Sequence, residues 1–524
     1  MPIQKAGATK KTGHRKLFLI LALIALIVIP LIAYFILSSG ILSQEARAAN
    51  EIKKLLDPLN PKDLNIVFFT LDTTRADHLA CYGYQSIETP NIDRLAADGV
   101  RLTNHYSGSP VCAPSRCSLF TGLHTGHAYI RDNDEMDSRG DVWHDLSLEG
   151  QRPLDAGTVT TATVLKQAGY ATGLIGKWGL GGPGSTGEPN RKGFDYFFGY
   201  LCQRIAHNYY PPYLWRNRDK VTLGNTYFYP HQKLPDGVDP LDVKSYAAYS
   251  GQQYAPDLMA DEALAFIRRN RERPFFLSLT FTIPHAALQV PEDSLAEYLG
   301  VLPDTPYKGE KGYLPHRAPH AAYAAMITRF DGYIGRVMAL VGELKLDNDT
   351  VVMFTSDNGP TFNGGTDSTF FESADGLRGL KQDVYEGGIR VPFVARWPGH
   401  IPSGRVSSLP CAFWDVLPTL AELGGAATPK GLDGVSLVPT LAGRPDEQPR
   451  RPYLYWEFSG HQAVRLGDWK GVRLRQATAT ELYDLAADPG ERTNVASAHP
   501  DVVARIEEIF RAGRTESALF PLKR

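Results

Sequence analysis

The longest uninterrupted apolar stretch of the chain lies close to its start. Residues 17–37 contain no charged side chain, and basic residues stand before them: Lys5, Lys10, Lys11, Arg15 and Lys16. About 20 apolar residues suffice for a helix to cross a bilayer, and the basic flank stays in the cytoplasm. The pattern predicts that residues 1–50 hold a transmembrane signal anchor, with the rest of the chain outside the cytoplasm, periplasmic or extracellular. Ala46-Arg47-Ala48 offers a cleavage site as the alternative, and the protein would then be secreted.

Beyond residue 60, short apolar runs alternate with amphipathic stretches. Runs rich in β-branched and aromatic residues predict buried strands at residues 65–71, 171–175, 275–281 and 350–355. Apolar spacing and start or stop residues predict helices near residues 90–98, 158–168 and 322–340. This alternation predicts an α/β sandwich with a mostly parallel central sheet.

A polar segment at residues 443–451 resembles a linker. Beyond it, strands are predicted at residues 453–458, 462–465 and 470–474, and a helix at residues 501–511. We therefore expect a large domain over residues 60–446, which would carry the site, and a small α+β domain over residues 447–524.

Composition narrows the class of protein only moderately. The chain has 524 residues, of which 43% are hydrophobic and 10% aromatic, which excludes a disordered or fibrous protein. A net charge of −2 gives no indication of a nucleic-acid partner. None of the five cysteines stands at CxxC spacing, which argues against zinc and thioredoxin-like sites. Their odd number predicts that one is free or special in an oxidising compartment.

Polar side chains follow the predicted strands where these end, and open α/β sheets bind ligands beyond the carboxyl ends of their strands. The residues are Asp72, Lys177, His285, Asp357 and Asn358, with Lys381 and Glu386 on a later glycine-rich segment. Oxygen ligands such as Asp72, Asp357 and Asn358 suit Ca²⁺ or Mg²⁺. Lysines and a histidine at the same edge suit a tetrahedral oxyanion. A lone residue of this kind is usually a cap or a solvated surface group, but several at the same edge are a stronger signal than any one.

Cys112 opens the strongest local pattern. Pro114 is placed to begin a helix, so Cys112 would lie at a helix N-terminus, where backbone N–H groups favour an anion. The residues alone leave two interpretations open: a reactive thiolate of low pKa, or a buried or disulfide-bonded cysteine.

The segment Cys112-Ala-Pro-Ser-Arg116, with Leu119 and Thr121-Gly122 after it, resembles the signature C-x-P-S-R-x-x-L-x-T-G of the formylglycine-dependent sulfatases. Similar blocks follow along nearly the whole chain: Leu71-Asp-Thr-Thr-Arg75, Ile175-Gly-Lys-Trp178, Ser356-Asp-Asn-Gly359, residues 385–392 and Glu481-Leu-Tyr-Asp-Leu485. The resemblance implies an arylsulfatase-like hydrolase of the alkaline-phosphatase superfamily, with that superfamily's sandwich fold. Its substrates would be sulfate monoesters, on a sulfated polysaccharide or other sugar, or on an aryl group.

The same resemblance implies a cofactor and a maturation partner. A formylglycine-generating enzyme would convert Cys112 to Cα-formylglycine, and the hydrated aldehyde would be the nucleophile. One of its hydroxyls would attack sulfur and release the alcohol, and the other would expel sulfate. A calcium ion, rather than Mg²⁺, would be held by Asp72, Asp357, Asn358 and the modified Cys112.

Roles for the remaining charged residues also come from the resemblance. Arg116 would hold the formylglycine, and Lys177 and Lys381 would bind the sulfate. His285 would stand near the leaving oxygen, and His285 or Lys381 would give it a proton.

Two positions depart from the family pattern. Thr73 stands where a second aspartate is common, so one expected carboxylate ligand is missing. Gly179 follows Lys177-Trp178 where a histidine is usual. His127 and Asn133 are the candidates to compensate for that histidine.

The segment at residues 199–211 is dense in Tyr, His and Arg, and we expect its Arg204 and His207 to contact a sugar. An aromatic surface loop packed on the sheet edge is the alternative. His461 and Arg465 of the small domain are expected to close over the same pocket.

Two other functions remain open from the sequence. One is a phosphate or phosphonate monoester hydrolase on the same fold, although Asn358 and Ser115 favour sulfate. The other is an inactive sulfated-glycan-binding homologue, which the missing histidine at Gly179 allows and the intact charged residues disfavour.

Overall fold

The computed structural model describes residues 63–134 and 149–522, all within the unit Pro61–Arg524. The predicted membrane anchor and cleavage site fall outside the described residues. Among the helices that are described, none is both long and apolar enough to cross a membrane.

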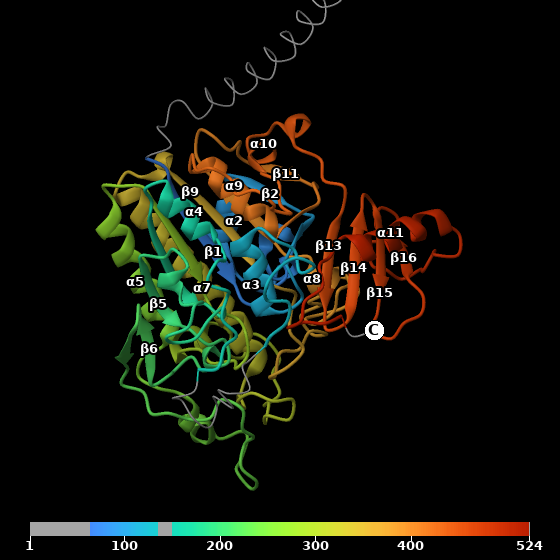
Figure 1. Ribbon diagram of the computed structural model, residues 1–524. Helices are drawn as coiled ribbons and strands as arrows, with labels where there is room; N and C mark the ends of the chain where they lie inside the picture. The colour runs from blue at the N-terminus through green and yellow to red at the C-terminus, as the bar shows by residue number, and fades with distance from the viewer. Residues whose placement is uncertain (1–62, 135–148, 523–524) are drawn as a thin grey trace, which may run out of the picture. The chain divides into compact units, whose positions relative to one another are not determined.

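A ten-stranded sheet forms the centre of this unit (Figure 1). Its middle strands run parallel, in the order β9 (Thr350–Ser356), β1 (Asn65–Leu71), β8 (Phe275–Thr280), β4 (Ala171–Lys177) and β5 (Tyr196–Tyr200). Short strands widen it beside β9, namely β10 (Phe393–Arg396), β2 (Val100–Leu102) and β11 (Arg405–Ser407), and beside β5, namely β6 (Tyr213–Arg216) and β7 (Asp219–Thr222). The predicted mostly parallel sheet is therefore confirmed.

Helices cover the sheet in two groups. All residues of β1 are buried, as expected of a parallel strand covered on both faces. Its alternate residues Val67, Phe69 and Leu71 share a core with one group: α2 (Pro90–Ala97), α5 (Ala255–Asn270) and α7 (Pro319–Glu343). The second group packs together as α3 (Cys112–Thr121), α4 (Thr161–Gln167) and α9 (Val416–Leu423). Short helices lie between these elements: α6 (Glu292–Tyr298), α8 (Glu386–Ile389) and α10 (Val438–Leu441).

The C-terminal residues form a separate antiparallel sheet, drawn in red in Figure 1. Its strands are β13 (Leu454–Phe458), β14 (His461–Leu466), β15 (Trp469–Arg473) and β16 (Glu481–Asp484). Helix α11 (Pro500–Ala512) packs on one face through Ile506 and Phe510, and Trp456 on the other face packs against Tyr106 and Trp414. The predicted small α+β end domain is confirmed as a fold, while its boundary at residue 447 stays a prediction.

Parallel pairing brings the carboxyl ends of the middle strands to one edge. Leu71 of β1 pairs with Ser356 of β9, and Gly176 of β4 pairs with Thr280 of β8. The residues that follow these strand ends must therefore meet beyond the same edge, next to the start of α3.

Candidate active site

Cys112 is the first residue of α3 and is only 2% exposed. Ser115, one turn into the helix, accepts a hydrogen bond on Oγ from the backbone N–H of Gly108, which fixes the chain that enters α3. The thiol Sγ lies 3.5 Å from Asp72 Oδ1, 3.7 Å from Lys381 Nζ and 3.8 Å from Asn358 Nδ2. Cys112 is thus surrounded by the polar residues that follow β1 and β9 and by Lys381.

The structure argues against a reactive thiolate at this position. Burial, together with the nearby Asp72 carboxylate, raises the pKa of the Cys112 thiol. Desolvation thus favours the neutral thiol at this position. All five cysteines are free, so the disulfide-bonded alternative is not realised either.

The guanidinium of Arg116 contacts residues at the ends of three strands, β9, β4 and β1. Its Nε and Nη2 donate to Asp357 Oδ2 at 3.1 and 2.8 Å, and its Nη1 donates to the Lys177 carbonyl at 2.8 Å. Nη2 also lies 3.5 Å from Asp72 Oδ2. A guanidinium suits this place because its donors are held in a fixed planar fork.

Lys177 and Asp72 form a buried ion pair, with Nζ 2.7 Å from Oδ2. Burial alone would raise the pKa of Asp72. The positive charges of Lys177 and Arg116 outweigh burial and hold the pKa of this carboxyl well below its usual value. Asp72 is therefore ionised across the physiological pH range.

Side-chain oxygens suited to a hard cation converge at this point. Asn358 Oδ1 is buried and has no hydrogen-bond partner within residues 63–134 and 149–522, although Asn358 Nδ2 donates to Asp357 Oδ1 at 2.7 Å. An unpartnered buried acceptor beside the carboxylates of Asp72 and Asp357 fits a divalent metal ion with oxygen ligands. Thr73 adds no carboxylate here, as expected; its backbone N–H donates to Asp357 Oδ1 at 3.1 Å.

His285 and Lys381 form a second pair across the site from Arg116. His285 Nδ1 lies 2.5 Å from the Ala286 carbonyl, so Nδ1 must carry the proton and Nε2 accepts from Lys381 Nζ at 2.9 Å. Burial, followed by the charge of Lys381, lowers the pKa of His285 well below its usual value. The imidazole is neutral, with its free lone pair directed at the lysine.

A polar cavity of about 230 Å³ opens in front of Cys112. Predicted residues that line it are Cys112, Lys177, Arg204, His207, His285 and Lys381. The ring of His207 stacks on that of His285 with centroids 4.4 Å apart and planes at 12°. The segment at residues 199–211 thus contributes to the pocket wall.

Other residues of the wall were not predicted as site residues: Val111, Gln203, Tyr313, Thr361, Asn363 and Gln382. Gln203 lies inside a segment that the sequence singled out. Tyr313 has no such signal, because it comes from an irregular loop between α6 and α7.

The expectation that His461 and Arg465 close over the pocket is wrong. Neither lines the cavity. Arg465 is buried in the C-terminal sheet and donates to the Tyr106 hydroxyl, and His461 Nδ1 accepts from the Arg475 backbone N–H at 3.1 Å. Both side chains are used within the packing of β14.

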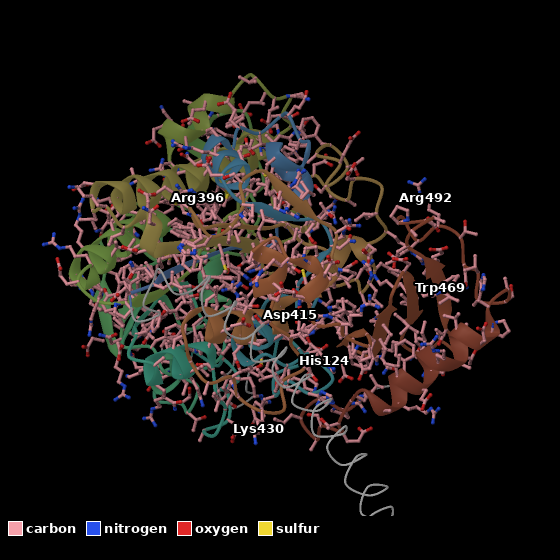
Figure 2. All side chains as sticks on the ribbon, turned by 90° about the horizontal axis from the view of Figure 1, so that it is seen from above. His124, Arg396, Asp415, Lys430, Trp469 and Arg492 are labelled. Atoms are coloured by element: carbon pink, nitrogen blue, oxygen red, sulfur yellow. The ribbon has the colours of Figure 1, made fainter. Side chains whose placement is uncertain are left out.

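The candidates to compensate for the missing histidine at Gly179 differ in position. Asn133 lines the cavity, and its Oδ1 accepts from the Ala113 backbone N–H at 2.9 Å. His127 is instead bound to Asp433, with Nδ1 2.9 Å from Oδ1. It stacks on His124, which is labelled in Figure 2, with centroids 4.5 Å apart.

The group of His124, His127 and Asp433 has ligand atoms within 4.8 Å of one another. His124 Nδ1 accepts from the Gly126 backbone N–H at 3.1 Å, so Nε2 carries the proton of the neutral ring and faces Asp433. A protonated Nε2 cannot bind a metal. The group therefore joins the chain after α3 to the loop at Asp433.

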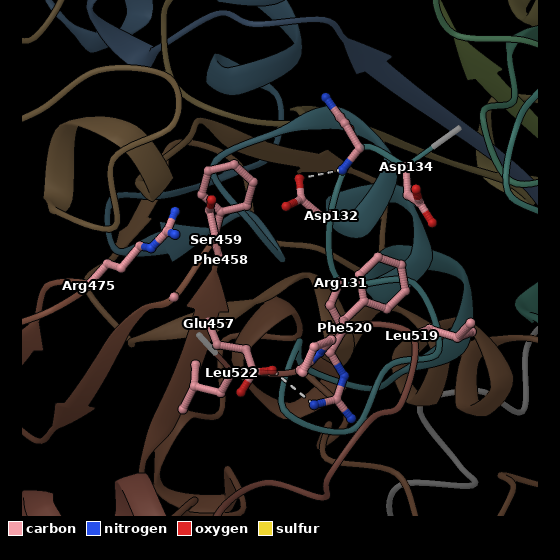
Figure 3. A pocket seen from close by; sticks show the side chains of 13 residues that line it. Arg131, Asp132, Asp134, Glu457, Phe458, Ser459, Arg475, Leu519, Phe520 and Leu522 are labelled. Carbon is pink, nitrogen blue, oxygen red and sulfur yellow. Dashed lines mark hydrogen bonds and ion pairs between the residues drawn. The ribbon is translucent and has the colours of Figure 1, made fainter. Parts of the chain in front are cut away.

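A second cavity of about 250 Å³, whose lining residues are drawn in Figure 3, shares Asn133 with the first. The tip of the β13–β14 hairpin supplies Phe458 and Ser459. At its base, Arg131 Nη1 donates to Glu457 Oε1 at 2.9 Å, as Figure 3 shows. The C-terminal sheet thus borders the space next to the polar cavity.

Comparison with known proteins agrees with this geometry. The model of the sulfatase family matches residues 64–426, and that of the N-sulphoglucosamine sulphohydrolase C-terminal region matches residues 380–514. Human arylsulfatase A is 32% identical, over 85% of this chain and 86% of its own length. The N-acetylgalactosamine-6-O-sulfatase of Bacteroides thetaiotaomicron is 29% identical, over 87% of this chain and 94% of its own length.

Solved structures give the same fold. One from a study of glycosaminoglycan metabolism by Bacteroides thetaiotaomicron has a TM-score of 0.68 at 26% identity, covering 86% of this chain and 99% of the other. The phosphonate monoester hydrolase of Agrobacterium radiobacter has a TM-score of 0.58 at 22% identity, covering 88% of this chain and 99% of the other. The chain thus belongs to the sulfatase family and is a sulfuric ester hydrolase.

Proposed function

We propose that the protein is an exported or membrane-anchored sulfatase that hydrolyses sulfate monoesters of sulfated carbohydrates, with formylglycine at position 112 and a calcium ion. One observation carries the proposal. Cys112 Sγ lies within 3.8 Å of an acidic, a cationic and an amide side chain, those of Asp72, Lys381 and Asn358, at the wall of a polar cavity.

Formylglycine resolves a chemical difficulty at this position. A buried thiol with a raised pKa is a poor nucleophile toward a negatively charged sulfate ester. The hydrated aldehyde supplies one hydroxyl to attack sulfur and a second whose deprotonation expels sulfate. Because Cys112 is 2% exposed in the folded protein, a formylglycine-generating enzyme would have to reach it before the chain folds.

Calcium would be held by Asp72, Asp357, Asn358 and the modified residue 112. Calcium is favoured over magnesium because it accepts an irregular set of oxygen ligands, whereas magnesium demands a near-ideal octahedron. Its charge would offset that of the sulfate oxygens, which otherwise repel an attacking oxygen. The unpartnered Asn358 Oδ1 supports this assignment.

Lys177 and Lys381 account for sulfate binding and for protonation of the leaving alcohol in this proposal. Lys177, paired with Asp72, and Lys381, paired with His285, would bind the sulfate oxygens from two sides. The ammonium of Lys381 shares a proton with His285 Nε2, so this pair would protonate the alcohol as it leaves. Arg116 keeps Asp357 and the end of β4 in place.

A sugar is the substrate class that the wall of the cavity supports best. Arg204, His207, Asn133 and Asn363 give it hydrogen-bonding groups of both kinds. Relatives include N-acetylgalactosamine-6-sulfatases, and one solved neighbour was crystallised with D-glucosamine-2-N,6-O-disulfate. The export of the protein, proposed from residues 17–37, would place it where sulfated glycans occur.

Peptide mass spectrometry of the segment around Cys112, from protein made in its native host, tests the central claim. Formylglycine at this position is the expected result, and an unmodified thiol would overturn it. Cys112→Ala should abolish sulfate release, whereas Cys411→Ala, which also alters a buried cysteine, should not. Turnover of an aryl sulfate and of the matching aryl phosphate separates the proposal from a phosphate or phosphonate hydrolase. An inactive glycan-binding homologue would turn over neither.

A further inference from the structure

Gly179 leaves a small space beside the side chain of Arg116. A Cβ placed there would lie 3.6 Å from Gln203 Cβ, 3.7 Å from Gln203 Oε1 and 4.0 Å from Arg116 Cδ, all ordinary contact distances. The space is therefore bordered by a side chain that comes from the loop after β5. Gln203, and not His127, faces the position where the family's histidine is missing.

The Gln203 side chain is buried without being used inside the protein. The residue is 5% exposed, and its Oε1 has no hydrogen-bond partner among the residues that the structure describes. The backbone of Gln203, in contrast, is held by a hydrogen bond from its N–H to Gln151 Oε1 at 3.3 Å. A buried amide oxygen without a partner destabilises a fold, and a leucine or methionine would fill the same space without that penalty.

The partner that Gln203 Oε1 lacks must be a hydrogen-bond donor, because an amide oxygen can only accept. Gln203 lines the polar cavity together with Lys177, Arg204 and His285, so a bound substrate comes within its reach. A sulfate group is fully ionised and offers only acceptor oxygens, so it cannot satisfy Oε1. A hydroxyl on the alcohol part of the substrate can do so, and the terminal amide torsion is soft enough to follow it.

We infer that Gln203 is a specificity-determining residue that hydrogen-bonds a hydroxyl next to the sulfate ester of a sugar substrate. This rests on the proposed sulfatase function. A histidine at position 179 would occupy the space beside the Gln203 side chain, and glycine at this position leaves that space to Gln203. The side chain favours polyhydroxylated sulfates over simple aryl sulfates, and it does so without a charge that changes with pH.

Gln203→Met tests the inference, since methionine has similar length and no hydrogen-bonding amide. With the sugar sulfate that the wild type hydrolyses best, taken from a panel of sulfated monosaccharides, kcat/KM should fall about tenfold, the equivalent of one lost hydrogen bond. With 4-nitrophenyl sulfate, which has no hydroxyl beside the ester, kcat/KM should stay within about twofold, since no hydrogen bond is lost there. The melting temperature should be unchanged or higher.

Gln151→Met is the matched control, because its side chain holds the same loop through Gln203 N and the Asp134 carbonyl. It should lower the melting temperature and reduce turnover of both substrates together. If Gln203→Met behaves like this control, the residue is structural and the inference is wrong. If the wild type cleaves the aryl sulfate but no sugar sulfate, the inference also fails, while the sulfatase chemistry stands.

Discussion

Asp357 Oδ2 accepts hydrogen bonds from both Nε and Nη2 of Arg116, at 3.1 and 2.8 Å, and neither side chain is exposed to solvent. This pair joins the end of β9 to the helix that begins at Cys112. A carboxylate held in this way keeps its other oxygen directed toward Asn358 and Thr73. The position of the oxygens that we propose to bind calcium therefore depends on an arginine that need not touch the substrate.

Replacing Arg116 by Met should show how much the fold depends on this pair. The change leaves Asp357 buried without its partner, and breaking a buried pair in this way costs about 3–5 kcal/mol. Urea unfolding should report a loss of that order, together with loss of sulfate release. Arg94→Met is the control: Arg94 is 82% exposed and pairs with Asp98 at 3.7 Å, and such a pair is worth under about 1 kcal/mol. Similar stability for both variants would contradict the account.

Calcium should stabilise the wild type and act through Asn358. Any ion that binds only the folded state raises its melting temperature with concentration, and EGTA should reverse the rise. Asn358→Leu removes the unpartnered oxygen, so we expect the calcium-dependent rise to shrink greatly. His127→Ala alters the separate group of His124, His127 and Asp433, and it should leave the calcium response intact. Loss of the response in His127→Ala, with retention in Asn358→Leu, would contradict the assignment and place the ion at the group of His124, His127 and Asp433.

His105 should make the stability of the fold sensitive to acid. It is fully buried between Phe393 and Phe413, and neither ring nitrogen has a partner in the described part of the chain. Burial lowers its pKa to about 3. In the unfolded chain a histidine titrates at about 6.5. Between these values the unfolded state binds one more proton, so the stability is fully present above pH 6.5 and is lost as the pH falls.

His105→Phe should therefore weaken the pH dependence of the free energy of unfolding between pH 7 and pH 4. At pH 7 the variant should be as stable as the wild type or more so, since two unpaired buried nitrogens are removed. Urea unfolding at the two pH values measures this. The control is His499→Phe, a half-buried histidine beside Trp469, which should leave the slope nearly unchanged. An unaltered slope in His105→Phe would refute the assignment.

Much of the site followed from the strand pattern, for a physical reason. Asp72 and Asp357 come directly after buried apolar runs, and parallel pairing brings the ends of such runs together. Lys177 is the last residue of β4 and meets Asp72 by the same rule. For these residues the fold class alone was enough to predict proximity.

Other features of the fold and the site could not be predicted from the local sequence. Strands β2, β10 and β11 have three or four residues each, too few to show a period, and they join the sheet only at its edge. Tyr313 reaches the cavity with a φ of 64°, from a loop anchored by Leu314 in a small core with Ala287. Arg465 was expected to close over the pocket, but it donates to Tyr106, which is distant in sequence. Long-range packing decides such positions.

Thr73 gives the most direct test of how this chain departs from its family. It is fully buried with a φ of 63°, a backbone conformation that a β-branched residue adopts only under strain. Aspartate and asparagine tolerate it better. Both Thr73→Asp and Thr73→Asn should therefore relieve strain, but only aspartate adds a charged oxygen beside Asp72 and Asp357.

The two variants should differ in opposite directions with and without calcium. In EGTA, Thr73→Asp should unfold at a lower temperature than Thr73→Asn, because a third carboxylate repels the other two. With calcium the order should reverse, since ligand charge tunes the affinity of such sites, and the apparent affinity of Thr73→Asp should exceed that of the wild type by at least about tenfold. Melting curves over a calcium titration give both numbers. Equal calcium responses in the two variants would mean that residue 73 does not face the ion, and that the ion lies further toward Asn358.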